Sequence, residues 1–282
     1  MQNIPPHIIP HRVQYDSLEA LNYSGAKELL KSPAHYRLYI DGEREATKAL
    51  RVGSYVHALV LDPAKVDAAF AIAPSVDRRT KDGKAAYEAF TSSLQPGVTV
   101  LSAEEAAESL LIASAAKGCI TRHGFKFKAT ELMFLTTYME ANIKAAIDAV
   151  GEDGYLYDLK TCEDASPAGF LKAVRAYRYN LQANFYKAAY YAGFKEPVLG
   201  FRFICVEKES LQTAVYELGP DLMAYGYTDF VKAVDSYKAC LASGEWPGYS
   251  QDIQTLDLNK APTEAAAPIN LDRKSTRLNS SH

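Results

Sequence analysis

Residues 144–161 read KAAIDAVGEDGYLYDLKT, and they predict two short strands joined by a tight turn. Residues 141–150 are apolar around one acid, and residues 155–161 alternate aromatic or apolar with polar side chains, as a half-buried strand does. The intervening GEDG is typical of a hairpin turn. Because side chains two residues apart on a strand share a face, Asp158 and Lys160 project together, and the hairpin could bring Asp148 beside them.

Two carboxylates and one ammonium in a single place suit the Mg²⁺-dependent hydrolysis of phosphodiesters. The oxygens of Asp148 and Asp158 can hold a hard cation, and the ammonium of Lys160 can orient the attacking water or stabilise developing negative charge. The same residues would also fit a solvated hairpin that carries an ion pair. This stretch alone therefore leaves two alternatives, a catalytic site and a structural hairpin.

The composition is that of a soluble globular chain with one large domain or two small ones, since 48% of its 282 residues are hydrophobic and 23% are charged. It contains no apolar run long enough to span a membrane and no charged-then-apolar leader, so we expect neither a membrane span nor a signal peptide. The formal charge of −3 gives no basic footprint, which argues against a nonspecific nucleic-acid-binding surface.

The four cysteines are widely spaced and form no CxxC pair; they are Cys119, Cys162, Cys205 and Cys240. This pattern argues against a zinc or iron–sulfur site and against a disulfide framework. We therefore expect a protein of the reducing cytoplasm.

Residues 17–250 are expected to form a single domain between two less regular ends. Residues 1–16 are rich in proline and predict an irregular arm, while residues 251–271 include an Ala/Pro/Thr-rich stretch and predict a disordered tail. The last residues, 272–282 (DRKSTRLNSSH), resemble the translation of a common sequencing adapter, so we expect them not to belong to the protein.

Periodicity and capping residues predict the order of elements within this domain. Helices are expected up to residue 31, from residue 33, and over 47–61, 102–118, 166–192 and 221–243; strands are expected over 125–138, 141–150, 155–161, 198–206 and 212–218. The polar run 77–84 (DRRTKDGK) predicts a mobile loop. This order predicts one mixed α/β domain with a helical N-terminal portion.

Several motifs, in this order, resemble the PD-(D/E)XK nuclease superfamily and, within it, the exonuclease VIII (RecE-type) branch of phages and prophages. The motifs are His57 in an apolar helix, Glu131, Ile147-Asp148, Asp158-Leu159-Lys160 and Gln182-x-x-x-Tyr186. Longer segments are similar too: SPAHY (32–36), GSYVHALVLDP (53–63), DLKTCEDASP (158–167), QANFY (182–186) and WPGYS (246–250). The resemblance covers residues 17–250 and implies a restriction-endonuclease-like core, with a central mixed β-sheet flanked by helices.

The resemblance implies a metal site. Asp148 and Asp158 take the positions of the metal-binding acids, with Ile147 in place of the nominal proline, and His57 adds an imidazole ligand. On the residues alone, a histidine inside an apolar helix could equally be a satisfied core residue. The implied cofactor is Mg²⁺, and because imidazole is a softer ligand than Mg²⁺ usually takes, Mn²⁺ should also support activity.

The remaining motif residues have catalytic roles by the same resemblance. Lys160 takes the position of the catalytic lysine, and Gln182 and Tyr186 match the QxxxY motif that lies beside the scissile strand. Glu131 is the candidate for an additional acid that helps to place metal or water. Gln182 and Tyr186 lie on a tyrosine-rich helix, where core packing is the alternative.

The implied activity is that of an Mg²⁺-dependent exodeoxyribonuclease. It would hydrolyse linear double-stranded DNA from the 5′ end and leave 3′ single-stranded tails for recombination. The implied partners are double-stranded DNA ends, a single-strand annealing protein and further copies of the chain in a homo-oligomeric ring, and no membrane is expected.

Three alternatives stay open. An endonuclease of the superfamily would use the same metal site. A RecB-like nuclease with an iron–sulfur cluster would need three cysteines near the C-terminus, where Cys240 stands alone, and a helicase-fused form would need a P-loop, which the sequence lacks. A degenerate, non-catalytic DNA-binding module would be marked by loss of an acid or of the lysine, and this chain retains them all.

Overall fold

A computed structural model of the chain describes residues 6–42 and 47–255. The chain divides into two compact units, Met1–Gly248 and Tyr249–His282. The helices and strands named below all belong to the first unit. The adapter-like residues 272–282 and most of the predicted tail, 251–271, lie outside the described residues, so both expectations remain predictions.

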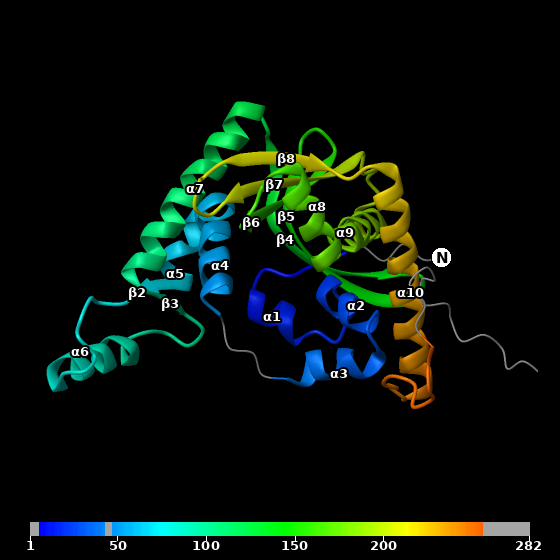
Figure 1. Cartoon of the computed structure of the whole chain (residues 1–282), viewed down its shortest axis with the longest axis horizontal. Helices are drawn as coiled ribbons and strands as arrows, with labels where there is room; N and C mark the ends of the chain where they lie inside the picture. Colours follow the sequence, from blue (N-terminus) through cyan, green and yellow to red (C-terminus); the bar gives the residue numbers. More distant parts are fainter. Residues whose placement is uncertain (1–5, 43–46, 256–282) are drawn as a thin grey trace, which may run out of the picture. The chain divides into compact units, whose positions relative to one another are not determined.

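A six-stranded sheet forms the centre of the first unit, with the strand order β1-β4-β5-β6-β7-β8. Figure 1 labels the strands β4 to β8 of this sheet. The strands are β1 (His7–Ile8), β4 (Phe127–Tyr138), β5 (Ala141–Gly151), β6 (Tyr155–Cys162), β7 (Gly200–Glu207) and β8 (Thr213–Glu217). β6 and β7 are parallel, and the other neighbouring pairs are antiparallel. A parallel pair needs a crossover, which α8 (Pro167–Tyr177) and α9 (Tyr179–Phe194) provide.

Helices cover both faces of this sheet (Figure 1). One face carries α2 (Tyr23–Leu29), α9 and α10 (Pro220–Ser243), with α3 (Pro33–Asp41) beside α2 and α10; on the other face α4 (Lys48–Leu61) packs against α7 (Ala103–His123). The remaining elements are α1 (Arg12–Ser17), the 3₁₀ helix η1 (Pro63–Lys65), α5 (Val66–Ala69), β2 (Phe70–Ile72), α6 (Lys81–Ser92) and β3 (Thr99–Leu101). The predicted mixed α/β architecture, with a central mixed sheet flanked by helices, is confirmed.

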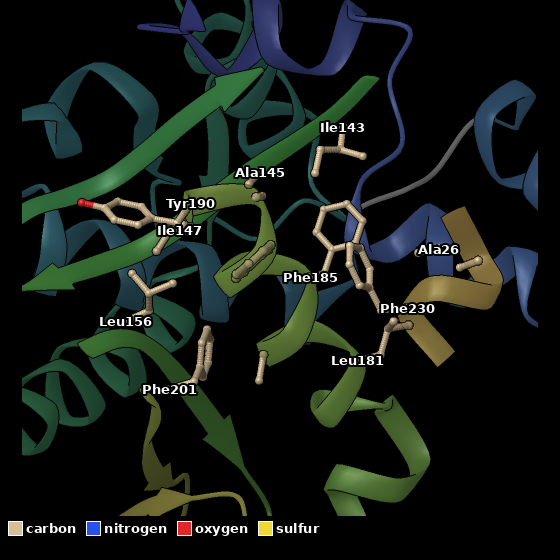
Figure 2. Close-up of a cluster of buried hydrophobic side chains, with 14 of the residues drawn as sticks. Ala26, Ile143, Ala145, Ile147, Leu156, Leu181, Phe185, Tyr190, Phe201 and Phe230 are labelled. Carbon is tan, nitrogen blue, oxygen red and sulfur yellow. The ribbon is translucent and has the colours of Figure 1, made fainter. Parts of the chain in front are cut away.

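The two largest apolar clusters among the described residues hold the layers together. Figure 2 shows the larger one, in which strand side chains such as Ile147, Leu156 and Phe201 meet helix side chains such as Phe185 and Phe230. The second core lies on the other face and joins α4 and α7 to the sheet; it includes Val52, Val56, Ile112, Ala149 and Leu159. Side chains of β5 and β6 belong to both cores, so these two strands are packed on both faces. Each large apolar side chain that is fully buried stabilises the fold by about 1.5–3 kcal/mol.

The predicted single helix over residues 166–192 is wrong, because the structure divides it into α8 and α9. It begins as expected, with the Ser166 hydroxyl accepting from the Gly169 N–H and with Pro167 in the first turn. Arg178 then adopts a left-handed conformation (φ 57°, ψ 45°), and α9 starts at Tyr179. No glycine or proline marks this break in the sequence.

Two predictions of irregular chain are wrong in part. Within the expected arm 1–16, β1 pairs with β4, and α1 begins at Arg12. The pairing partner lies far along the chain, so the local sequence does not reveal it. The expected loop 77–84 overlaps the start of α6, which Thr80 caps by accepting from the Gly83 N–H.

The described residues include no helix whose length and apolar character would let it cross a membrane.

Candidate active site

The site lies where β5 and β6 part. The two strands pair only at Ala149↔Tyr157 and Val150↔Leu156. Beyond these pairs, Asp148 Oδ2 accepts a 2.8 Å hydrogen bond from the Leu159 backbone N–H, so a side chain takes the place of a ladder bond. The strands therefore form a fork, with Asp148 on one branch and the Asp158-Leu159-Lys160 triplet on the other.

His57 reaches this fork from α4. The apolar residues of α4, among them Val52 and Val56, seat the helix on the sheet. The His57 ring lies with Nε2 2.9 Å from the Leu159 carbonyl oxygen and with Nδ1 3.4 Å from Asp148 Oδ2. One imidazole thus contacts both branches of the fork.

Glu131 approaches from the third side, on β4. The pairs Thr130↔Ala149 and Leu132↔Ile147 flank it, so Glu131 lies across from Asp148. Its φ of 48° is in the left-handed region, which costs on the order of 1 kcal/mol or more for a residue other than glycine. Its Oε1 is buried and has no hydrogen-bond partner among the described residues, and it lies 3.9 Å from His57 Nδ1.

These three residues form a group suited to a divalent cation. One ligand atom from each of His57, Glu131 and Asp148 lies within 4.8 Å of the others. Two carboxylate oxygens and one imidazole nitrogen are donors that Mg²⁺ and Mn²⁺ accept. Facing acids without a cation repel each other, and the orphaned Glu131 oxygen is an acceptor with room for one. The residues present therefore fit the metal that the resemblance implies.

Protonation of the group reflects the same crowding of charge. Burial would lower the pKa of His57, but the charges of Asp148 and Glu131 outweigh it and raise that pKa to about 9. Burial, reinforced by the charge of Asp148, raises the pKa of Glu131 to about 7. Burial also opposes ionisation of Asp148, yet His57 and Lys160 hold its pKa below the usual value. Without a cation, the group therefore retains a proton on His57 at neutral pH.

Asp158, Lys160 and Gln182 form a second, adjoining set. Lys160 Nζ lies 2.6 Å from Asp158 Oδ2, and Gln182 Nε2 on α9 donates a 2.6 Å hydrogen bond to Asp158 Oδ1. The Asp158 side chain is only 3% exposed. Burial raises its pKa to about 6, although the Lys160 charge opposes this. The Asp158 charge in turn outweighs burial at Lys160 and raises the pKa of the ammonium.

The structure thus brings most of the predicted residues together but divides them differently. The converging group contains Glu131, whereas Asp158 stands beside it. Asp158 Oδ1 accepts from Gln182, and Oδ2 forms an ion pair with Lys160 but, like Glu131 Oε1, is buried without a hydrogen-bond partner among the described residues. Metal ligation by Asp158 remains a prediction. Tyr186 lies one turn beyond Gln182 on α9, and its ring meets Tyr23 edge-to-face at 6.3 Å.

A groove of about 1320 Å³ opens over the site, and its lining includes His57, Glu131, Asp148, Lys160 and Tyr186. One residue near it was not among those predicted from the sequence: Tyr179, whose ring centroid lies 4.5 Å from Lys160 Nζ. Tyr179 precedes Gln182 by three residues and so shares its helix face, a signal that becomes visible only once the start of α9 is known.

Comparison with known families identifies the fold. Residues 22–259 match a family described as a PDDEXK-like domain of unknown function (DUF3799). The chain belongs to this family. The superfamily suggested by the motifs is therefore confirmed, while the exonuclease VIII branch stays a proposal.

A solved structure supports the fold of this PDDEXK-like domain. It is that of a "Putative exonuclease" from Eubacterium rectale, which is similar with a TM-score of 0.57 and 13% identity over 86% of this chain and 91% of that one. The structure of SSO0001 aligns over 77% of this chain and 83% of that one at 12% identity, but its TM-score of 0.29 is too low to carry an argument. No curated protein matches the sequence.

Proposed function

We propose that this PDDEXK-like domain is a metal-dependent exodeoxyribonuclease that degrades linear double-stranded DNA. The observation that carries the proposal is the convergence of His57, Glu131 and Asp148 at the fork, directly beside the Asp158–Lys160 pair. The family description and the name of the Eubacterium rectale protein support a nuclease.

The converging group would hold the cofactor, Mg²⁺ or Mn²⁺, with Asp158 as a further ligand by resemblance. A bound divalent ion would lower the pKa of a water molecule and neutralise charge on the scissile phosphate. Glu131 and Asp148 are suited to this role because each presents an oxygen to the same point, and His57 completes the set from α4.

Lys160 would act directly on the substrate. Its ammonium lines the groove, and the pKa raised by Asp158 keeps it positive throughout the neutral range. It can donate a hydrogen bond to the phosphate oxygen on which negative charge develops. Gln182 would keep Asp158 in place by donating a hydrogen bond from its amide, which stays a donor at every pH of interest. Tyr186 lines the groove and would form its wall beside the scissile strand.

The finer parts of the proposal follow the exonuclease VIII resemblance. Digestion would start at 5′ ends and leave 3′ single-stranded tails for a single-strand annealing protein to use in recombination, in the cytoplasm of a bacterial host. A homo-oligomeric ring around DNA would make the enzyme processive by topology. Encirclement would also remove the need for a strongly basic surface, which agrees with the formal charge of −3.

Substrate form and polarity are testable in one assay with the full-length chain. The substrates are linear duplex labelled at the 5′ or the 3′ end, closed circular duplex and single-stranded DNA, each with Mg²⁺. We expect the linear duplex alone to be consumed, with early release of the 5′ label, and we expect Lys160→Ala to abolish this. Cutting of the closed circle would indicate an endonuclease instead, and digestion of no substrate would support the non-catalytic module.

A further inference from the structure

The ammonium of Lys160 has a second neighbour besides Asp158. Its Nζ lies over the ring of Tyr179, 4.5 Å from the centroid, a distance at which a cation is attracted to the electron-rich face of an aromatic ring. The Lys160 side chain is 17% exposed, so this contact lies in a partly desolvated place where such an attraction is stronger than in water.

The Tyr179 ring is itself held in place. It stacks on Phe203 of β7, with centroids 5.6 Å apart, and on Phe170 of α8 at 5.9 Å. Phe203 is the direct neighbour of Asp158 in the β6–β7 pairing. The ring therefore packs against β7, the strand that pairs with the Asp158–Lys160 stretch of β6, and its position under the Lys160 ammonium is fixed.

The break between α8 and α9 puts Tyr179 there. Arg178 Nη1 lies 2.6 Å from Asp229 Oδ2 of α10, and this ion pair accompanies the left-handed conformation at Arg178. The Tyr23 hydroxyl donates to the Tyr177 carbonyl oxygen at the end of α8. Because α9 begins at Tyr179, its first turn presents Tyr179 to Lys160 and Gln182 to Asp158 from the same helix face.

We infer that Tyr179 is a positioning residue, which holds the Lys160 ammonium toward the groove through the face of its ring. The inference rests on the proposed function, because it assigns Tyr179 a role through the proposed catalytic lysine. A lysine side chain has four rotatable bonds, and a fixed support reduces the freedom that must be lost when it meets a phosphate. Unlike a second carboxylate, the ring orients the ammonium without adding a negative charge that would repel the phosphate.

Two substitutions distinguish the effect of the aromatic face of Tyr179 from the effect of its apolar packing. Tyr179→Phe keeps the ring face, and Tyr179→Leu keeps an apolar side chain of similar reach but removes the face. We expect Tyr179→Phe to retain kcat within about twofold and Tyr179→Leu to lower kcat about tenfold, the rate equivalent of a partly desolvated cation–π contact. KM for DNA should stay unchanged in both, because Tyr179 is not proposed to contact the substrate. An unchanged kcat in Tyr179→Leu, with active wild type, would overturn the inference.

A spectroscopic measurement tests the contact independently of activity. Protons above an aromatic ring resonate upfield, so the ε-CH₂ signal of Lys160 in ¹³C-lysine-labelled protein, assigned by its loss in Lys160→Arg, should be shifted upfield. The shift should persist in Tyr179→Phe and vanish in Tyr179→Leu. An unshifted signal in the wild type would overturn the inference even if the protein digested no DNA. Inactivity together with a shifted signal would overturn the proposed function while supporting the contact.

Discussion

At the residue scale, the candidate metal group brings two carboxylates close enough to repel each other. Glu131 and Asp148 face each other across β4 and β5, and the proton on His57 partly compensates for their charge. Glu131 also adopts a left-handed φ within a strand. Crowded charge and backbone strain of this kind are typical of functional sites rather than of solvated hairpins.

A bound cation should remove the repulsion between the Glu131 and Asp148 carboxylates, so Mn²⁺ should raise the Tm of the wild type. The metal requires neutral imidazole, whereas His57 carries a proton up to a pKa of about 9. Metal binding must therefore release that proton, and the Tm shift should be larger at pH 8.5 than at pH 6.5. Thermal denaturation at both pH values, with Mn²⁺ or EDTA, measures this.

Glu131→Gln and Glu152→Gln form a matched pair for that measurement. Glu131→Gln should reduce the Mn²⁺-induced shift, and it should raise the Tm in EDTA because it removes one of two facing charges. Glu152 is an exposed acid in the turn after β5, and its substitution should leave the shift unchanged. Equal shifts in all three proteins would contradict the assignment of Glu131 to the metal group.

The sequence predicted which residues lie in the site better than it predicted which of them contact one another. Asp148, Asp158 and Lys160 could be placed together because hairpin geometry is local. Which acid completes the group with His57 depends on the register between β4 and β5 and on the engagement of Asp158 by Gln182 from α9. Neither is visible in a local pattern, so the sequence named Glu131 only as an additional acid, whereas the structure places it with His57 and Asp148; metal ligation by Asp158 remains a prediction.

At the element scale, the start of α9 depends on its contact with α10. Helix α10 passes so close to α9 that a Cβ added at Gly226 would lie 2.3 Å from the Asn180 carbonyl oxygen. Asn184 Nδ2 donates to the carbonyl oxygens of Asn180 and Met223, which joins the two helices at the same place. The break at Arg178 was unpredictable for the same reason, since its partner Asp229 lies on another helix.

Gly226→Ala should therefore destabilise the fold, although alanine is the better helix former. The clash with Asn180 should cost about 1–3 kcal/mol in the free energy of unfolding. Gly118→Ala on α7 is the matched control, because a Cβ there meets no atom within 4 Å among the described residues. It should stabilise by about 0.5–1 kcal/mol. Urea denaturation measures both, and equal effects of the two substitutions would contradict the close packing of α9 on α10.

At the scale of the whole molecule, residues 7–18 are attached to the sheet rather than left as an irregular arm. Lys144 of β5 is buried, and its ammonium donates to the carbonyl oxygens of Tyr15, Asp16 and Leu18 at the end of α1. The Tyr15 hydroxyl donates back to the Lys144 carbonyl oxygen. One lysine thus fixes α1 beside the groove over the site.

Lys144→Met should release this segment. Three carbonyl oxygens would lose their donor, and each that stays buried costs about 1–3 kcal/mol. We expect faster amide hydrogen exchange over residues 12–21, with the exchange of α9 little changed. Lys126→Met, at an exposed position, should leave the exchange of residues 12–21 as it is in the wild type. If residues 12–21 exchanged as slowly in Lys144→Met as in the wild type, the proposal that Lys144 fixes α1 would be contradicted.

The sequence predicted the order of the main helices and strands, and with it the mixed α/β architecture, because periodicity and caps such as Ser102 and Ser166 are local signals. It did not predict β1 or the parallel pair β2–β3. These strands are very short and gain their hydrogen bonds from distant segments, so nothing in their own composition marks them.

The most direct test of the account is the release of nucleotides from linear duplex DNA by the full-length chain and by Asp148→Asn, side by side. Asp148 contacts both His57 and the Leu159 N–H, so its carboxylate is central to the proposed site. We predict release by the wild type with Mg²⁺, none with EDTA, and a loss on the order of 10²-fold or more in Asp148→Asn. Release that persisted in EDTA or in Asp148→Asn would contradict a metal-dependent nuclease at this fork.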